Sequence, residues 1–294
     1  MKKHNTLRVL CLLVFLTLLV IFCGYALGGE RGIVIALCFA GVMNFWIYWF
    51  SDKVVLAMHR AQPLAEEEAP EVFEIVRRFS KKAGIPMPRL YMLPSASANA
   101  FATGRDSRHA SIAITHGIVG LLNKEELSGV LGHELAHILN HDILLSTVVA
   151  MLAGALSMIA SMFRWSFFWG GERDERDSSN PLALLLAVIV MPFVVILIKL
   201  VIFRDREYTA DSRGSELCEE PLYLASALRK IDNASKRYPL LDAGPATAHL
   251  FIVNPLLRKG WGFFFNTHPP MEDRIIRLEA MSGAQVRGPT TPYS

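Results

Sequence analysis

Four long apolar runs constrain this 294-residue chain more than any other feature of its sequence. A helix needs about 20 predominantly apolar residues to cross the hydrocarbon core of a bilayer. The runs close to this length are 9–27, 33–50, 143–163 and 181–203. Lys199 is the only ionised residue inside the last two, and it lies near an end, where its side chain can reach the interface. We therefore expect four transmembrane helices in two hairpins, 1–50 and 143–203, embedded in a lipid bilayer.

Two other interpretations of these runs exist. The first run could be a cleaved signal peptide, and the last two could be buried core helices of a soluble protein. However, no small-residue cleavage site follows the first run, and the second run begins only a few residues later. The length of the last two runs and their lack of charge argue against a soluble core.

Basic residues collect at one end of the apolar runs. They precede the first run, follow the second and follow the fourth: Lys2, Lys3, Arg8, Lys53, Arg60, Arg204 and Arg206. The short loop within each hairpin carries no excess of basic residues. Because basic flanks stay on the cytoplasmic side of a membrane, both termini and the polar segments 51–142 and 204–282 are expected to be cytoplasmic.

The polar segments predict a domain of the α+β class, mainly α with a small β-sheet. Strands are expected at 89–93 and 111–115, and the small-residue stretch between them is either an irregular loop or an exposed edge strand. Amphipathic periodicity predicts helices over 64–84, 123–142 and 204–231, and a last helix that Thr267 caps and that runs through Met271, Ile275 and Leu278. Asn123 and Glu126 have the spacing of a capping box at the start of the second of these helices. The tail 283–294 is expected to be flexible.

Composition excludes two classes of site. The net charge is only +3, and no basic stripe interleaved with aromatic residues is present, so nucleic acid is not an expected partner. The four cysteines, Cys11, Cys23, Cys38 and Cys218, form no C-x-x-C pair. This spacing excludes a cysteine zinc site and a disulfide framework.

The segment 132–142, GHELAHILNHD, carries the clearest chemical signal in the chain. His133 and His137 are four residues apart, so on a helix both imidazoles leave the same face and can bind one zinc ion. Glu134 would then lie beside the open coordination position, where it can act as a general base toward a water molecule. The H-E-x-x-H pattern therefore predicts a site for one Zn²⁺ per chain.

The third protein ligand is less clear from the residues alone. His141 continues the four-residue spacing, but three imidazoles in a row on one helix cannot all converge on one ion. Glu207 follows the fourth run, and Asp211 lies one turn later, where it could accept the second ring N–H of a ligand histidine. On periodicity alone, an ordinary solvated helix face is the better explanation of both carboxylates. Asn140 and Asp142 fit polar residues at the membrane boundary.

The motif and the second carboxylate pair lie close to the apolar runs. If one helix continues from the motif into the third run, His137 lies about 9 Å before Ile143. By the same rise, Glu207 lies about 6 Å beyond Phe203. The metal would then lie on the order of 10 Å from the interface, within reach of loops and unfolded tails of membrane proteins.

The sequence resembles the M48 family of membrane zinc metalloproteases over essentially its whole length. Besides the paired runs, four motifs carry the likeness: NAFATGRDS (99–107), HELAHILNHD (133–142), REYTAD (206–211) and THPPMEDRIIRL (267–278). The resemblance implies a zincin-like (gluzincin) protease domain. It also implies that His133, His137 and Glu207 are the zinc ligands and that Glu134 is the catalytic base.

The resemblance assigns roles to residues that periodicity leaves unexplained. It implies that Asp211 and Asn140 support the ligands and that His268 and Arg274 stabilise the oxyanion. Taken alone, His268 would be a helix-start residue and Arg274 a surface residue. The resemblance also makes the stretch between the strands the edge strand that binds substrate, through Asn99, Ala100, Phe101, Ala102 and Thr103.

The implied function is zinc-dependent hydrolysis of peptide bonds in misfolded or damaged membrane proteins, as part of a stress response at the cytoplasmic face of the bacterial inner membrane. Membrane-protein substrates and other quality-control proteases are the implied partners. Two rival functions fit the sequence less well. A non-proteolytic chaperone or scaffold with a structural metal would have no use for Glu134. A four-span transporter would need ionised residues deep in its spans.

Overall fold

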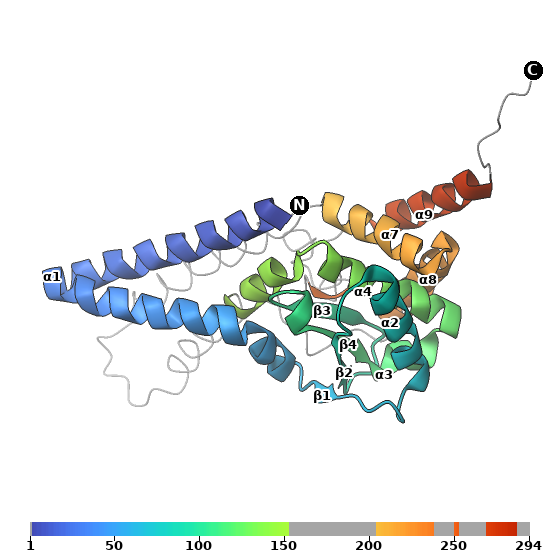
Figure 1. Cartoon of the computed structure of the whole chain (residues 1–294), viewed down its shortest axis with the longest axis horizontal. Coiled ribbons are helices and arrows are strands. Elements are labelled where there is room, and N and C mark those ends of the chain that lie inside the picture. Colours follow the sequence, from blue (N-terminus) through green and yellow to red (C-terminus); the bar gives the residue numbers. More distant parts are fainter. Residues whose placement is uncertain (1, 153–203, 238–249, 253–268, 287–294) are drawn as a thin grey trace, which may run out of the picture.

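The computed structural model describes residues 2–152, 204–237, 250–252 and 269–286. Figure 1 shows a helical hairpin, α1, that projects from a body of helices packed around a small sheet. The observed class, mainly helical with a small mixed sheet, confirms the predicted one. The fourth apolar run, 181–203, and His268 lie outside the described residues.

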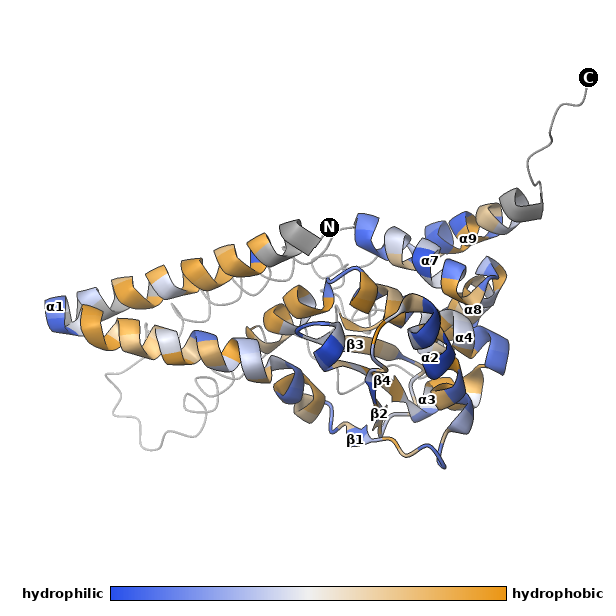
Figure 2. Ribbon diagram, viewed as in Figure 1, coloured by the Kyte–Doolittle hydropathy of each residue, from blue (hydrophilic) through white to orange (hydrophobic). Residues whose placement is uncertain are grey.

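Helix α1 (Lys2–Met58) contains the first two apolar runs. It forms two long arms (Figure 1), and Gly29, with a φ of +58°, begins the second arm. Asn44 Nδ2 donates to Thr17 Oγ1 at 2.8 Å and ties the arms together. Almost all exposed large apolar side chains of the described residues lie on α1, which is mostly orange in Figure 2. Such a wide apolar surface fits contact with lipid.

The expectation of four spans is only partly matched by the described residues. One described helix, Gly29–Met58, is long and apolar enough to cross a membrane. The first run forms a shorter apolar helix, Leu7–Phe22. The third run begins with the helix Ile143–Leu152, which passes the same test only as a bent pair with the helix before it. Four spans therefore remain a prediction.

The body contains a four-stranded sheet with the order β1-β2-β4-β3. Its strands are β1 (Gln62–Pro63), β2 (Arg89–Leu93), β3 (Ala100–Gly104) and β4 (Ala110–Thr115). Strands β2 and β4 are parallel, and the other pairs are antiparallel. The sequence predicted β2 and β4. For the stretch between them it left two possibilities, an irregular loop or an edge strand, and this stretch forms the edge strand β3. The short strand β1 was not predicted.

Six helices of the described residues pack on this sheet or on one another. They are α2 (Pro70–Ala83), α3 (His116–Leu121), α4 (Lys124–Leu139), α7 (Arg204–Cys218), α8 (Pro221–Arg237) and α9 (Met271–Val286). The single helix expected over 204–231 is wrong: the chain breaks at Glu219, whose φ is +66°, just before Pro221. Proline lacks the N–H that would continue the first helix. Helix α9 also continues past 283, where a flexible tail was expected.

Helix α4 is the central element of the body. It packs against α2, α7, α8 and β3. The expected division into one apolar and one polar side does not hold, because His133 and Glu134 are buried together with Leu131 and Leu135. The motif therefore lies inside the protein.

The chain turns sharply after α4. His141 has a φ of +57°, and the helix Ile143–Leu152 leaves at 89° to α4. The expected single helix from the motif into the third run is therefore wrong. The turn directs Asp142 back toward α4, where its amide donates to the carbonyl of His137 at 3.3 Å.

Candidate metal centre

The capping box predicted for α4 is present. Asn123 Oδ1 accepts from the amide of Glu126 at 2.8 Å, and the Asn123 amide donates to Glu126 Oε2 at 3.1 Å. Ser226 and Lys230 of α8 each donate to the same carboxylate at 2.7 Å. The start of α4 is thus fixed both within the helix and to its neighbour.

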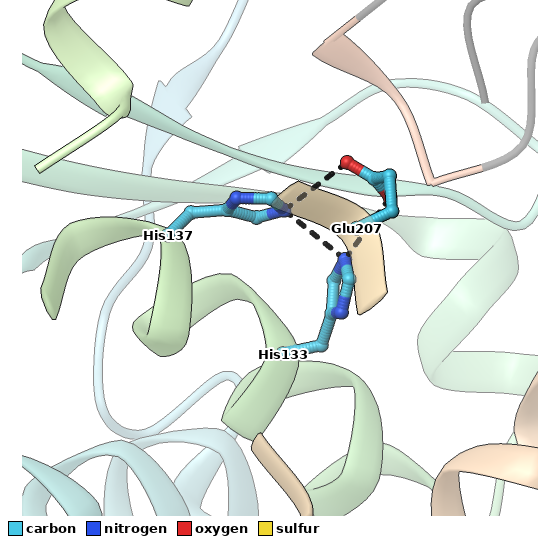
Figure 3. Close-up of side chains that lie close together, drawn as sticks. All are labelled: His133, His137 and Glu207. Carbon is cyan, nitrogen blue, oxygen red and sulfur yellow. Dashed lines mark hydrogen bonds and ion pairs between the residues drawn. The ribbon is translucent and has the colours of Figure 1, made fainter. Parts of the chain in front are cut away.

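Three side chains from α4 and α7 converge, as Figure 3 shows. The Nε2 atoms of His133 and His137 are 3.1 Å apart. Each Nε2 lies 3.7 Å from an oxygen of Glu207. One ligand-type atom from each residue lies within 4.8 Å of the others. The structure therefore brings together the two histidines of the motif and a carboxylate that is 70 residues further along the chain (207 − 137).

Two glycines let α7 approach α4 closely enough for this convergence. A Cβ atom on Gly214 would lie 2.7 Å from the backbone nitrogen of His133, and one on Gly132 would lie 2.9 Å from the carbonyl oxygen of Gly214. Both distances are too short for non-bonded atoms. Sequence reasoning missed this pair, whose only signal is a small residue in each helix.

We expect Gly214→Ala to separate the two helices and lower peptide cleavage about 10²-fold, because a displacement of about 1 Å can cost that much. Metal content, measured by mass spectrometry on the purified protein, should fall with activity. Gly120→Ala is the matched control, since no heavy atom lies within 4 Å of a Cβ at that glycine of α3. Unchanged metal content and activity in Gly214→Ala would contradict the role of this close approach.

A carboxylate orients each of the two imidazoles. His133 Nδ1 lies 2.9 Å from Asp211 Oδ1, and His137 Nδ1 lies 3.2 Å from Asp142 Oδ2. Such contacts favour a proton on Nδ1 and leave the Nε2 lone pairs free to bind a metal. Asp142 was expected only as an interfacial residue, because the turn that returns it to His137 could not be foreseen.

Asn140, expected beside the ligands, makes a different contact. Its Oδ1 accepts from Arg213 Nη1 of α7 at 2.8 Å. This bond joins the end of α4 to α7 at the level of the motif. A direct influence of Asn140 on the ligands stays a prediction.

Arg274 of α9 is fully buried beside His133 and Glu207. Its Nε and Nη2 donate to the two oxygens of Asp211 at 2.9 and 2.6 Å. Its Nη1 lies 3.5 Å from Glu207 Oε2. Burial disfavours ionisation of Asp211, but Arg274 and His133 hold the pKa of that carboxyl below its ordinary value. The surface position that periodicity alone suggested for Arg274 is therefore wrong.

Glu134 is buried and faces the edge strand. Burial raises the pKa of its carboxyl to about 7, and the nearby Glu207 adds to the rise although His137 opposes it. The carboxylate also accepts a hydrogen bond from the Ala102 amide. Glu134 thus joins the motif on α4 to strand β3.

The charge of the cluster fits a cation. Burial lowers the pKa of His137, but Asp142, Glu207 and Glu134 outweigh burial and raise that pKa to about 10. The buried carboxylates of the cluster outnumber its buried arginines: Glu134, Asp142, Glu207 and Asp211 against Arg206 and Arg274. Together with the converging Nε2 atoms, this excess of negative charge suits a divalent metal ion.

Strand β3 and Asn99 just before it contain the residues expected to bind substrate. Asn99 precedes the strand, and its amide donates to Thr115 Oγ1 at 2.9 Å. Phe101 pairs with Ala113 of β4 and stacks edge-to-face on Phe251. Thr103 Oγ1 lies 2.8 Å from Thr147 Oγ1. All the residues in 99–104 are buried.

Three backbone groups on the outer edge of β3 already have partners. The carbonyl of Ala100 accepts from the Ile252 amide at 3.4 Å, and the Gly104 amide donates to Thr147 Oγ1 at 3.2 Å. The alternation of an antiparallel strand puts the Ala102 amide on this same edge, where Glu134 accepts from it. A peptide that paired with β3 would have to replace these bonds.

Comparison with known sequences agrees with this geometry. The profile of Peptidase family M48 matches residues 66–282. A protein named "Protease HtpX homolog" from Syntrophobacter fumaroxidans is 48% identical over 277 residues, which cover 93% of this chain and 98% of that protein. Proteins with the same name are 49% identical in Thermodesulfovibrio yellowstonii, covering 95% and 99%, and 46% identical in Pyrococcus furiosus, covering 92% and 94%.

Among solved structures, the crystal structure of S. mikatae Ste24p has a similar fold. The TM-score is 0.50 at 17% sequence identity, and the match covers 94% of this chain and 66% of that one. At this identity the likeness concerns the fold alone.

Proposed function

Because this chain belongs to peptidase family M48 and is a metalloprotease, we propose that it is a membrane zinc endopeptidase that hydrolyses misfolded or damaged membrane proteins. The observation that carries the proposal is the convergence of His133, His137 and Glu207 beside a buried Glu134. Two imidazoles and one carboxylate are a common ligand set of catalytic zinc sites, which leave one position open. We propose one Zn²⁺ per chain at this cluster.

The chain's own residues support peptide hydrolysis in several ways. Zinc bound to this ligand set would supply Lewis acidity toward the scissile carbonyl and the attacking water. Glu134 would take the proton of that water and return it to the leaving amine. In the metal-free protein the pKa of Glu134 is about 7, which shows that this carboxyl can both accept and release a proton near neutral pH.

The outer edge of β3 is the proposed substrate-binding strand. An extended peptide would pair through main-chain bonds with Ala100 and Ala102, replacing the contacts that Ile252 and Glu134 make there. Freed from Ala102, the carboxylate of Glu134 would become available as a base. Main-chain pairing imposes little side-chain preference, which suits clearance of varied unfolded segments.

We assign Arg274 a positioning role, since it contacts Asp211, Glu207 and His133. These contacts favour support of the ligands over direct stabilisation of an oxyanion. His268, which lies outside the described residues, remains the proposed oxyanion donor.

We propose that the active site lies on the cytoplasmic face of a multi-pass inner-membrane protein, because basic residues flank the apolar runs on the side of the polar segments. The segments 51–142, between the two hairpins, and 204–282, after the second hairpin, would together form one protease domain. In this arrangement substrates would be membrane proteins with unfolded segments on that face.

The test uses full-length protein in liposomes with a panel of membrane proteins, each native and unfolded. We expect cleavage of unfolded substrates, loss of cleavage with a chelator, and recovery on addition of zinc. Cleavage that survives complete metal removal would refute the metal-dependent mechanism. Equal cleavage of native and unfolded substrates would refute the role in clearance.

Metal binding should release about one proton at pH 7.5, because the pKa of His137 in the metal-free protein is about 10 and the ring must lose its second proton to bind. Zinc affinity should therefore rise with pH until the pKa of His137 is passed. Calorimetry in buffers of different ionisation enthalpy measures this proton release. Asp142→Asn should reduce it, since the Asp142 carboxylate is the leading cause of the raised pKa. Equal proton release by both proteins would contradict the assignment.

A further inference from the structure

A cavity of about 510 Å³ lies where three apolar runs meet the loop between β3 and β4. Part of its lining is apolar: Val9, Tyr48, Leu144 and Leu145. Val9 begins the first run, Tyr48 is near the end of the second, and Leu144 and Leu145 begin the third. All three run ends are those next to the polar body. The cavity therefore lies at the boundary between the apolar helices and that body.

The rest of the lining is polar and mostly basic. Arg105, Arg108 and His109 come from the β3–β4 loop, and His141 comes from the turn after α4. The acidic residue of the lining is Asp106. This division into an apolar and a basic part resembles neither a protein core nor an ordinary solvated surface.

The loop is built to hold its arginines in place. Asp106 Oδ1 accepts from the amides of Arg108 and His109 at 2.8 and 3.0 Å and lies 2.8 Å from His109 Nδ1. Gly104, the last residue of β3, has a φ of +137° and lies directly before the loop. A Cβ atom there would lie 2.3 Å from the His109 carbonyl oxygen. The carboxylate of Asp106 thus accepts hydrogen bonds from groups within the loop itself.

The two arginines differ in their surroundings. The guanidinium of Arg105 lies over the ring of Trp49, 4.3 Å from its centroid, and 3.8 Å from Asp106. Arg108 is exposed and forms no ion pair with any residue in the described part of the chain. Tyr48 and Trp49 lie near the end of an apolar run, a position where aromatic residues mark the membrane interface. If the hairpin inserts into a membrane, the loop thus presents a net positive charge near the lipid headgroups.

We propose that this cavity binds the headgroup of an anionic phospholipid. Arg105 and Arg108 contact the phosphate, and the apolar lining contacts the glycerol and the first acyl carbons. Basic pockets between membrane helices favour such headgroups. A free phosphate would share the charge chemistry, but it would gain nothing from the apolar lining. The inference depends on membrane insertion of the hairpin and not on peptidase activity.

Native mass spectrometry of the full-length protein in equal amounts of phosphatidylglycerol and phosphatidylcholine tests this site. Wild-type protein should retain phosphatidylglycerol preferentially. Each arginine near an anionic lipid should raise the preference for that lipid about fivefold. Arg108→Gln should therefore lower the preference about fivefold, and the double variant with Arg105→Gln roughly twenty-five-fold.

Arg78→Gln is the control, because it removes the same charge from the exposed face of α2, away from the cavity. It should leave the lipid preference at the wild-type value. An undiminished preference in Arg108→Gln, or an equal loss in Arg78→Gln, would overturn the proposal. If millimolar inorganic phosphate displaced bound phosphatidylglycerol as effectively as added lipid does, the site would be one for a free anion instead.

Discussion

Glu134→Gln should lower the rate of peptide cleavage about 10²- to 10⁴-fold, the range expected for loss of a general base. Glutamine keeps the size of the side chain but cannot take up the proton of the attacking water. The Ala102 amide can still donate to its carbonyl oxygen. Since the ligand residues are untouched, the metal should remain bound. Cleavage of an unfolded membrane substrate and metal content are measured on the same sample.

Glu125→Gln is the matched control for this prediction. Glu125 is the exposed first-turn neighbour of Glu126 on α4, and its replacement removes the same charge without touching the cluster. It should cleave at the wild-type rate. If metal-loaded Glu134→Gln did so too, Glu134 would not be the base.

Arg274→Met should destabilise the protein by about 3–5 kcal/mol, because it leaves Asp211 and Glu207 buried without their cation. The loss should be larger in the metal-free protein, where the charge of a bound zinc ion does not compensate these carboxylates. Metal affinity should also fall about 10- to 100-fold, as Asp211 loses the contact that holds it against His133. Thermal unfolding with and without zinc measures both effects.

Arg277→Met on the same helix is the control. Arg277 is exposed and lies over the ring of Tyr208, so its loss removes a surface contact only. Zinc should stabilise this variant and the wild-type protein alike. Equal unfolding temperatures for Arg274→Met and Arg277→Met in the metal-free state would show that Arg274 does not neutralise the buried carboxylates.

The parts of the site that local sequence pattern specifies were predictable. The capping box of Asn123 and Glu126 and the four-residue spacing of His133 and His137 depend only on helix geometry. Strands β2 and β4 followed from short apolar runs between turn residues. Glu207 could be singled out only by resemblance to a family, because nothing in its own helix distinguishes it from a solvated acid.

The remaining parts depend on contacts between distant segments. Arg274 is buried because α9 packs behind α7, although its helix pattern resembles an exposed one. Asp142 reaches His137 because His141 adopts a left-handed conformation that no local rule requires of histidine. Gly132 and Gly214 matter only where two helices meet. Periodicity within one segment does not contain this information.

The shared metal position is tested most directly by X-ray absorption spectroscopy on zinc-loaded full-length protein, alongside Glu207→Gln. The wild-type protein should hold one zinc ion per chain, with two imidazole nitrogens and a carboxylate oxygen in its coordination shell. Glu207→Gln should lose most of the zinc or show a changed oxygen shell. An identical zinc content and spectrum in the two proteins would mean that Glu207 does not bind the ion held by His133 and His137.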